Sequence, residues 1–82
     1  MEKIILYGTN WCGGSKRAQR ILDQRQFEYE FIDIDQDKEG EAFVKETNRG
    51  FRSVPTIVFP DKSILTEPSS SELEAKLDSI GD

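Results

Sequence analysis

One residue in this sequence stands out for its chemistry: Cys12, the single cysteine, within Tyr7-Gly-Thr-Asn-Trp-Cys-Gly-Gly-Ser-Lys-Arg. It lies between a short apolar run and a segment of helical character, so we expect it directly before the first turn of a helix. The N–H groups of that turn lack partners within the helix, and the helix dipole places partial positive charge there. Both effects stabilise a thiolate, so the pattern predicts a nucleophilic Cys12 with a pKa below the ~8.5 of free cysteine.

The residues that follow Cys12 support this prediction. Gly13, Gly14 and Ser15 form the predicted helix start that would stabilise the thiolate, and the two glycines leave room for a second sulfur to approach. Positive charge from Lys16 and Arg17, one turn on, is expected to add to the effect. A lone cysteine is more often a small buried hydrophobe. The flanking residues show no apolar periodicity, however, and we therefore favour a reactive thiol.

Several other chemistries are excluded by composition. The sequence has no histidine, which removes Ser-His and Cys-His catalysis, histidine metal sites and a histidine pH switch. One soft ligand cannot hold a metal within one chain, although a site shared between two chains stays open. Gly8 and Gly13 have the spacing of a phosphate-binding loop, but Gly14 occupies the position where that motif requires lysine.

The charge balance argues against two classes of partner. Lys plus Arg number 11 and Asp plus Glu number 16, which gives a formal net charge of −5. A nucleic-acid backbone or an anionic membrane is therefore not the expected partner. The first residues carry charge and no long apolar core, so we expect no signal peptide. A lone unpaired cysteine indicates a reducing cytoplasm, and it cannot form a disulfide within the chain.

A second pattern with chemical meaning is Val54-Pro55-Thr56. A proline directly before a strand can simply be a residue that lacks a ladder donor. Alternatively, the Val54–Pro55 peptide bond is cis. A cis bond would turn the backbone groups of Val54 outward, where they could pair with an extended, peptide-like substrate. The pattern alone does not choose between these two interpretations.

The elements that position these residues follow from apolar periodicity and turn chemistry. With 82 residues and no repeat or linker, we expect one domain over residues 1–82. The predicted order is βαβαββα, an α/β fold with a mixed four-stranded sheet flanked by helices. The predicted strands are Lys3–Tyr7, Glu28–Ile34, Thr56–Phe59 and Ser63–Thr66, and the predicted helices are Ser15–Gln26, Lys38–Asn48 and one that starts at Ser69 or Ser71.

Connections and core positions are predicted in the same way. About 20 residues separate the first two strands, enough for a helical crossover, so these strands should be parallel, whereas the last two form an antiparallel hairpin. Asp35 or Asp37 should cap the second helix, and Gly50 should end it. A capping box, Ser69 with Glu72 or Ser71 with Glu74, should open the last helix. The expected core includes Phe27, Phe31, Phe43, Val44, Thr47, Phe51, Phe59, Leu73, Ala75, Leu77 and Ile80.

At its two motifs the chain resembles a glutaredoxin, a small protein with the thioredoxin fold. The likeness covers nearly the whole chain and is greatest to short bacterial proteins of the mycoredoxin type. It is carried by Trp-Cys-Gly before the first helix, by Ile-Asp-Ile-Asp after the second strand, by Arg-Ser-Val-Pro-Thr-Ile-Val-Phe-Pro-Asp, and by Glu-Pro-Ser near the end. The resemblance implies the thioredoxin fold and thiol–disulfide oxidoreductase activity.

The resemblance also implies roles for individual residues. Cys12 would attack a mixed disulfide between a protein and a low-molecular-weight thiol, glutathione or mycothiol. Pro55 would follow a cis bond, and the backbone of Val54 would pair with the bound thiol. Tyr7 and Trp11 could line the thiol groove, or could be a core tyrosine and a surface tryptophan. Arginines could pair with substrate carboxylates or simply be solvated; the candidates are Arg52 and Arg17.

This chain departs from the family pattern in two places. Most members have Cys-x-x-Cys, whereas Ser15 takes the position of the second, resolving cysteine. A monothiol cycle stays open, in which a second small thiol regenerates Cys12. Alternatively, Ser15 is an engineered change that traps the mixed disulfide. Glutathione-using members carry Gly-Gly-x-Asp before the last helix, where it binds the carboxylate end of glutathione. Here the segment is Leu65-Thr-Glu-Pro-Ser, so this mode of binding glutathione is not expected.

Three functions are compatible with these features. The first is reduction of protein mixed disulfides by a monomer that needs a small thiol and no metal. The second is a [2Fe–2S] carrier, because Cys12-Gly-Gly-Ser15 is similar to the Cys-Gly-Phe-Ser of monothiol glutaredoxins, which share a cluster between two chains. Against it, Gly14 replaces the phenylalanine, and Tyr7-Gly-Thr lacks the expected lysine. The third is a regulatory thioredoxin-fold module without a redox cycle.

Overall fold

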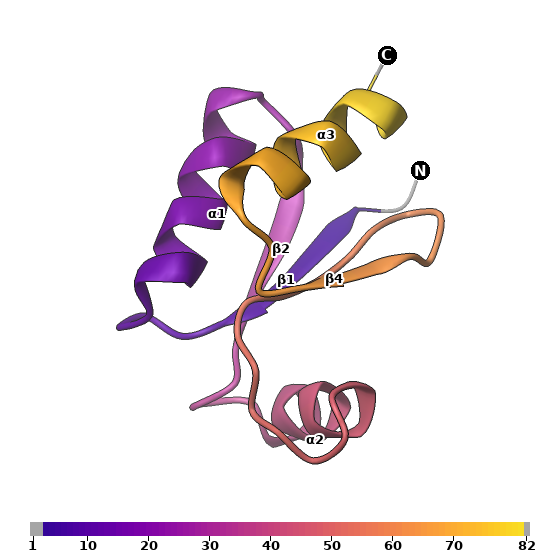
Figure 1. Ribbon diagram of the computed structural model, residues 1–82. Coiled ribbons are helices and arrows are strands. Elements are labelled where there is room, and N and C mark those ends of the chain that lie inside the picture. The colour runs from indigo at the N-terminus through magenta and orange to yellow at the C-terminus, as the bar shows by residue number, and fades with distance from the viewer. Residues whose placement is uncertain (1–2, 82) are drawn as a thin grey trace.

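Four strands form one mixed sheet in the computed structural model, which describes residues 3–81 (Figure 1). The element order is the predicted βαβαββα. The strands are β1 (Ile4–Gly8), β2 (Tyr29–Asp33), β3 (Thr56–Val58) and β4 (Ile64–Thr66), and the helices are α1 (Gly13–Gln24), α2 (Lys38–Thr47) and α3 (Ser70–Ile80). Helix α1 begins at Gly13, two residues earlier than the sequence pattern predicts, so Cys12 is its N-cap residue.

The sheet order, β2-β1-β3-β4, brings the two motifs to one edge. Strands β1 and β2 are parallel and β3 pairs antiparallel with β4, both as predicted. The structure adds the antiparallel pairing of β1 with β3. Because β1 and β3 run in opposite directions, the end of β1 lies beside the start of β3, where Tyr7 is paired with Thr56. The loop that leads to Cys12 and the Val54–Pro55 segment therefore meet at the same edge.

The core lies between the sheet and the helices α1 and α3, which pack against each other. It is built from apolar residues of β1, β3 and the inner faces of both helices: Ile4, Leu6, Ala18, Ile21, Leu22, Ile57, Phe59, Leu73 and Leu77. Helix α2 covers the opposite side of the sheet (Figure 1). There Val44 is buried and the ring of Phe43 stacks on Tyr7 with 4.8 Å between centroids.

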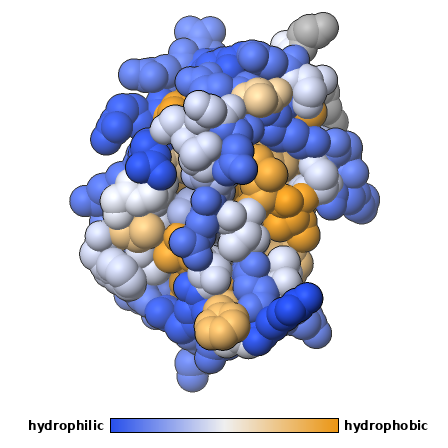
Figure 2. Space-filling view, viewed as in Figure 1, coloured by the Kyte–Doolittle hydropathy of each residue, from blue (hydrophilic) through white to orange (hydrophobic). Residues whose placement is uncertain are grey.

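Two predicted core residues are exposed instead. Phe51 is 68% exposed because the chain turns away after α2, where Arg49 and Gly50 both have positive φ. Ala75 lies on the outer side of α3, since Leu73 and Leu77, four residues apart, define the buried face. In Figure 2 most of the visible surface is hydrophilic, with apolar side chains reaching it over the β3–β4 hairpin, where Ile64 is exposed.

The helix ends differ in how they are capped. Asp37 rather than Asp35 caps α2, because its carboxylate accepts the Gly40 N–H at 2.9 Å. The capping box of α3 uses Ser69 and Glu72, one of the two predicted pairs. No helix within residues 3–81 combines the length and apolarity that crossing a membrane requires.

Candidate active site

Cys12 stands at the N-terminal end of α1, where β1 has just delivered the chain to the edge of the sheet. Its backbone is extended, with φ −87° and ψ 122°, and its carbonyl accepts the Lys16 N–H at 3.1 Å. Among the described residues, no side-chain hydrogen bond caps this helix, and its first turn carries no acidic residue. The free N–H groups and the uncompensated dipole of α1 therefore face the region of the Cys12 side chain.

The second motif lies directly against the sulfur. The Cys12 thiol donates to the Val54 carbonyl oxygen, with 3.8 Å between sulfur and oxygen. The Val54–Pro55 peptide bond is cis, as one of the two sequence interpretations holds. Residues 42 positions apart in the chain thus form one site, with Cys12 half-buried and accessible from outside.

The environment of Cys12 lowers the pKa of its thiol below the ordinary value. Burial acts in the opposite direction and raises the pKa, but the Ser15 hydroxyl and the N–H groups of Ser15 and Gly14, which stabilise the charged sulfur, outweigh it. The Glu67 carboxylate raises the pKa to a smaller extent. Of the three residues predicted to stabilise the thiolate, Gly14 and Ser15 act in this direction, and Gly13 is not among the causes of the shift. The contribution predicted from the charges of Lys16 and Arg17 is not among these causes.

Ser15 links the sulfur to the body of the fold. Its side chain is fully buried, and its hydroxyl accepts the Thr9 N–H at 3.3 Å while it faces Cys12. Gly8 makes room for it, because a Cβ at Gly8 would overlap the Ser15 oxygen. The Thr9 hydroxyl oxygen, also buried, has no hydrogen-bond partner among residues 3–81. Ser15 is therefore a fixed donor beneath the sulfur.

The two glycines after Cys12 have different surroundings. A Cβ at Gly14 would lie 3.2 Å from Cδ of Pro55 and 3.8 Å from the Cys12 sulfur. At Gly13, by contrast, a Cβ would have no neighbour within 4 Å among the described residues. Space beside the sulfur therefore depends on Gly14, and Gly13 lies toward solvent.

A hydrogen-bonded network holds the rim next to Cys12. The indole N–H of Trp11 donates to Asp35 at 2.8 Å, and the other oxygen of Asp35 pairs with Arg52 at 2.6 Å. Arg52 also pairs with Glu41 at 2.5 Å. The Trp11 hydrogen bond, together with Arg52, lowers the pKa of Asp35. Because two carboxylates already hold Arg52, its predicted pairing with a substrate carboxylate would require an exchange of partners.

The sequence analysis did not predict that acidic residues lie next to the site. Asp33 is the last residue of β2 and Asp35 follows it. Because β2 runs parallel to β1, both residues reach the same edge as the Cys12 loop. There the side chain of Asn10 donates to Asp33 at 3.1 Å. The Ile-Asp-Ile-Asp pattern and the parallel pairing were the signal that could have placed these carboxylates beside Trp11.

Tyr7 packs against α2. Its ring stacks on Phe43 on the α2 side of the sheet, and burial raises the pKa of its hydroxyl. Gly40 allows this packing, since a Cβ there would lie 2.8 Å from Ile32 and 3.5 Å from the Tyr7 ring. Trp11, in contrast, is 68% exposed beside Cys12. Of the two aromatic residues predicted for the thiol groove, Trp11 is thus exposed next to Cys12, whereas Tyr7 is packed against Phe43.

Comparison with known proteins identifies the family. Residues 4–64 match the sequence model of glutaredoxin. The chain belongs to the glutaredoxin family. A predicted glutaredoxin of Mycobacterium tuberculosis is 39% identical over 74 residues, which cover 90% of this chain and 88% of that protein. Mycoredoxin 1 of Corynebacterium glutamicum is 36% identical over 80 residues, which cover 98% and 99%.

The fold agrees with this assignment. The crystal structure of the glutaredoxin grx-1 from Archaeoglobus fulgidus matches with a TM-score of 0.69 and 26% identity over 100% of this chain and 89% of that one. The predicted thioredoxin-like α/β fold is thereby confirmed. Membership of the glutaredoxin family implies thiol–disulfide oxidoreductase chemistry with a low-molecular-weight thiol. Within residues 3–81, no three His, Cys, Asp or Glu side chains are grouped to hold a metal ion.

Proposed function

We propose that this protein reduces mixed disulfides between proteins and a low-molecular-weight thiol by a monothiol cycle through Cys12. The Cys12 thiolate attacks the small-thiol sulfur of the mixed disulfide. A new S–S bond forms between Cys12 and the small thiol, and the target protein leaves as a thiolate that takes up a proton. The thiolate of a second small thiol then attacks the small-thiol sulfur on Cys12, which forms a symmetric small-molecule disulfide and releases the Cys12 thiolate.

One observation carries this proposal: the position of the resolving cysteine is held by the fully buried hydroxyl of Ser15, which lowers the pKa of the Cys12 thiol. A hydroxyl cannot form a disulfide, and the sequence has no other cysteine. The hydroxyl does stabilise the thiolate, both as the attacking group in the first step and as the leaving group in the second. This arrangement supports a cycle that uses one protein thiol.

The rest of the site supports the same cycle. Trp11 and the Val54–Pro55 segment border the sulfur, and we propose that they contact the bound thiol, with the Val54 backbone as its hydrogen-bonding partner. The relationship to mycoredoxin 1 favours mycothiol over glutathione as that thiol. We place this activity in a reducing cytoplasm, and we propose that the protein acts as a monomer on protein mixed disulfides.

The test is a turnover assay on a peptide that carries mycothiol or glutathione as a mixed disulfide, with the free thiol as reductant. We expect turnover without any second protein thiol, and mass spectrometry of the quenched protein should find one small thiol attached to Cys12. The variant Cys12→Ser should be inactive and carry no adduct. Turnover that persists in Cys12→Ser, or turnover without an adduct on Cys12, would contradict the monothiol cycle.

A further inference from the structure

Glu67 has a backbone conformation that its position does not explain. Four residues other than glycine have positive φ in the described chain. Gln26 and Arg49 follow the ends of helices and Lys62 lies in the hairpin turn, all places where left-handed backbone is common. Glu67, with φ 49°, directly precedes Pro68, where backbone is ordinarily extended with negative φ. Such an outlier in a residue with a long side chain points to a function of that side chain.

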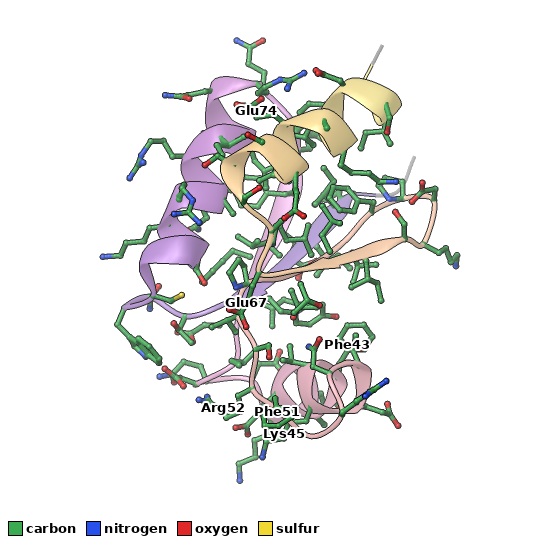
Figure 3. The ribbon with its side chains drawn as sticks, in the orientation of Figure 1. Phe43, Lys45, Phe51, Arg52, Glu67 and Glu74 are labelled. Carbon is green, nitrogen blue, oxygen red and sulfur yellow. The ribbon has the colours of Figure 1, made fainter. Side chains whose placement is uncertain are left out.

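The same residue is anchored beside the sulfur. The Glu67 N–H donates to the Pro55 carbonyl at 2.8 Å, and the preceding carbonyl, that of Val54, accepts the Cys12 thiol. Glu67 is exposed, and Figure 3 shows it on the chain that leaves β4, on the side of the molecule where α1 begins. The carboxylate thus stands at the rim of the site, next to the segment that borders the Cys12 sulfur.

No ion pair within residues 3–81 compensates the negative charge of Glu67. Arg52, which Figure 3 shows beside Phe51 at α2, pairs with Asp35 and Glu41. The exposed Lys16 and Arg17 extend from α1. Their charges are not among the causes that shift the pKa of Cys12, whereas the charge of Glu67 is.

We propose that Glu67 selects the small thiol by charge, favouring thiols with an ammonium group near the sulfur and disfavouring those with a carboxylate there. The inference rests on the proposed function, because it concerns the second step of that cycle. In this step a thiolate attacks the small-thiol sulfur bound to Cys12, a bond forms between the two small thiols, and the Cys12–sulfur bond breaks. The substituent of the incoming thiol must pass the rim, where Glu67 attracts or repels it.

The test measures this step alone. Cys12 is first converted to its mixed disulfide with 2-mercaptoethanol, which is neutral. The release of the adduct is then followed by stopped-flow with three thiols: cysteamine, 2-mercaptoethanol and 3-mercaptopropionate, which carry an ammonium group, no charge and a carboxylate. Each rate is compared between wild type and Glu67→Gln, so that intrinsic differences between the thiols cancel. Glu46→Gln, which removes an exposed carboxylate from α2, is the matched control.

Relative to 2-mercaptoethanol, we expect Glu67→Gln to raise the rate with 3-mercaptopropionate about threefold and to lower that with cysteamine by a similar factor, as for a unit charge several ångströms away in a wet site. High salt should abolish the difference in relative rates between wild type and Glu67→Gln, and Glu46→Gln should behave like wild type. Equal changes for all three thiols, or none, in a folded Glu67→Gln variant would overturn the inference. A wild-type adduct that is released no faster than that of a short cysteine peptide would instead overturn the proposed function.

Discussion

The N-terminal ends of α1 and α3 differ in what binds the free N–H groups of their first turn. At α3 the Ser69 hydroxyl accepts the Glu72 N–H, and the Glu72 carboxylate accepts the Ser69 N–H, which satisfies two free donors and adds a negative charge. At α1, by contrast, Cys12 occupies the cap position, and no side chain of residues 3–81 caps the helix. The N–H groups of Gly14 and Ser15 point to the sulfur instead.

This difference shows what a reactive cysteine requires from a helix. A good cap contributes about 1 kcal/mol to stability, and α1 lacks that contribution. Helix α1 is held instead by its buried face, with Ala18, Ile21 and Leu22 in the core. The free donors are thereby kept for the Cys12 thiolate, and α3, which has no catalytic role in this account, uses its donors for stability.

The largest expected effect comes from giving α1 the cap that it lacks. Cys12→Ser removes the nucleophile, so reduction of a mixed disulfide should fall to the uncatalysed rate. Serine is a good N-cap, so the same change should raise the free energy of unfolding by about 0.5 to 1 kcal/mol. Urea denaturation below the pKa of Cys12 measures this, with Cys12→Ala as control. A Cys12→Ser variant that retains activity, or that is less stable than Cys12→Ala, would contradict the comparison.

A smaller effect is expected from crowding the space beside the sulfur. In Gly14→Ala the added methyl group would press on the Pro55 ring, and the shift should lower kcat/KM about tenfold. Gly13→Ala, one residue earlier, adds its methyl group in open space and should stay within about twofold of wild type. Steady-state assays of both variants test this. Equal losses in the two would show that Gly14 has no special place in the site.

At α3 the corresponding change should affect stability alone. Ser69→Ala removes the hydroxyl of the capping box and should lower the free energy of unfolding by about 1 kcal/mol, with kcat/KM unchanged. Ser71→Ala is the control, because Ser71 belongs to the capping box that does not form, and it should change stability by less than about 0.5 kcal/mol. Urea denaturation of the two variants measures both free energies of unfolding. Loss of activity in Ser69→Ala would contradict the prediction, because it would mean that the start of α3 affects the site at the start of α1.

The smallest effect is expected from the rim network. Asp35→Asn weakens the acceptor of the Trp11 indole and the partner of Arg52, both exposed, so stability should change by less than about 1 kcal/mol. Trp11 is the only tryptophan, so its fluorescence reports its surroundings directly. We expect a shifted emission maximum and a higher KM with little change in kcat. Identical fluorescence and kinetics in wild type and Asp35→Asn would show that the network does not hold Trp11.

Most of the fold was predictable because local signals and chain order agreed. The apolar run of β1, the periodicity of α1 and the long crossover between the first two strands fixed the parallel pairing. The place of Cys12 at the start of a helix was predictable as well, because it depends on position along the chain and not on distant contacts.

The surroundings of several side chains could not be predicted from the sequence, because they depend on contacts between segments that are far apart in the chain. Tyr7 and Trp11 looked alike as groove residues, but strand alternation sends Tyr7 to Phe43 on the α2 side. Arg52 looked like an anion-binding residue because its partners, Asp35 and Glu41, lie on separate segments. Phe51 is apolar and yet exposed, since the turn that ends α2 directs it outward.

The central claim is that hydrogen bonds from the start of α1 hold Cys12 as a thiolate, and its most direct test is the pH dependence of Cys12 alkylation by iodoacetamide. In folded wild type, the rate should rise with pH through a midpoint below that of the same protein unfolded in urea, because the folded-state pKa is lowered. Ser15→Ala should move the midpoint upward, toward the unfolded value. A folded midpoint at or above the unfolded one, unmoved by Ser15→Ala, would contradict the account.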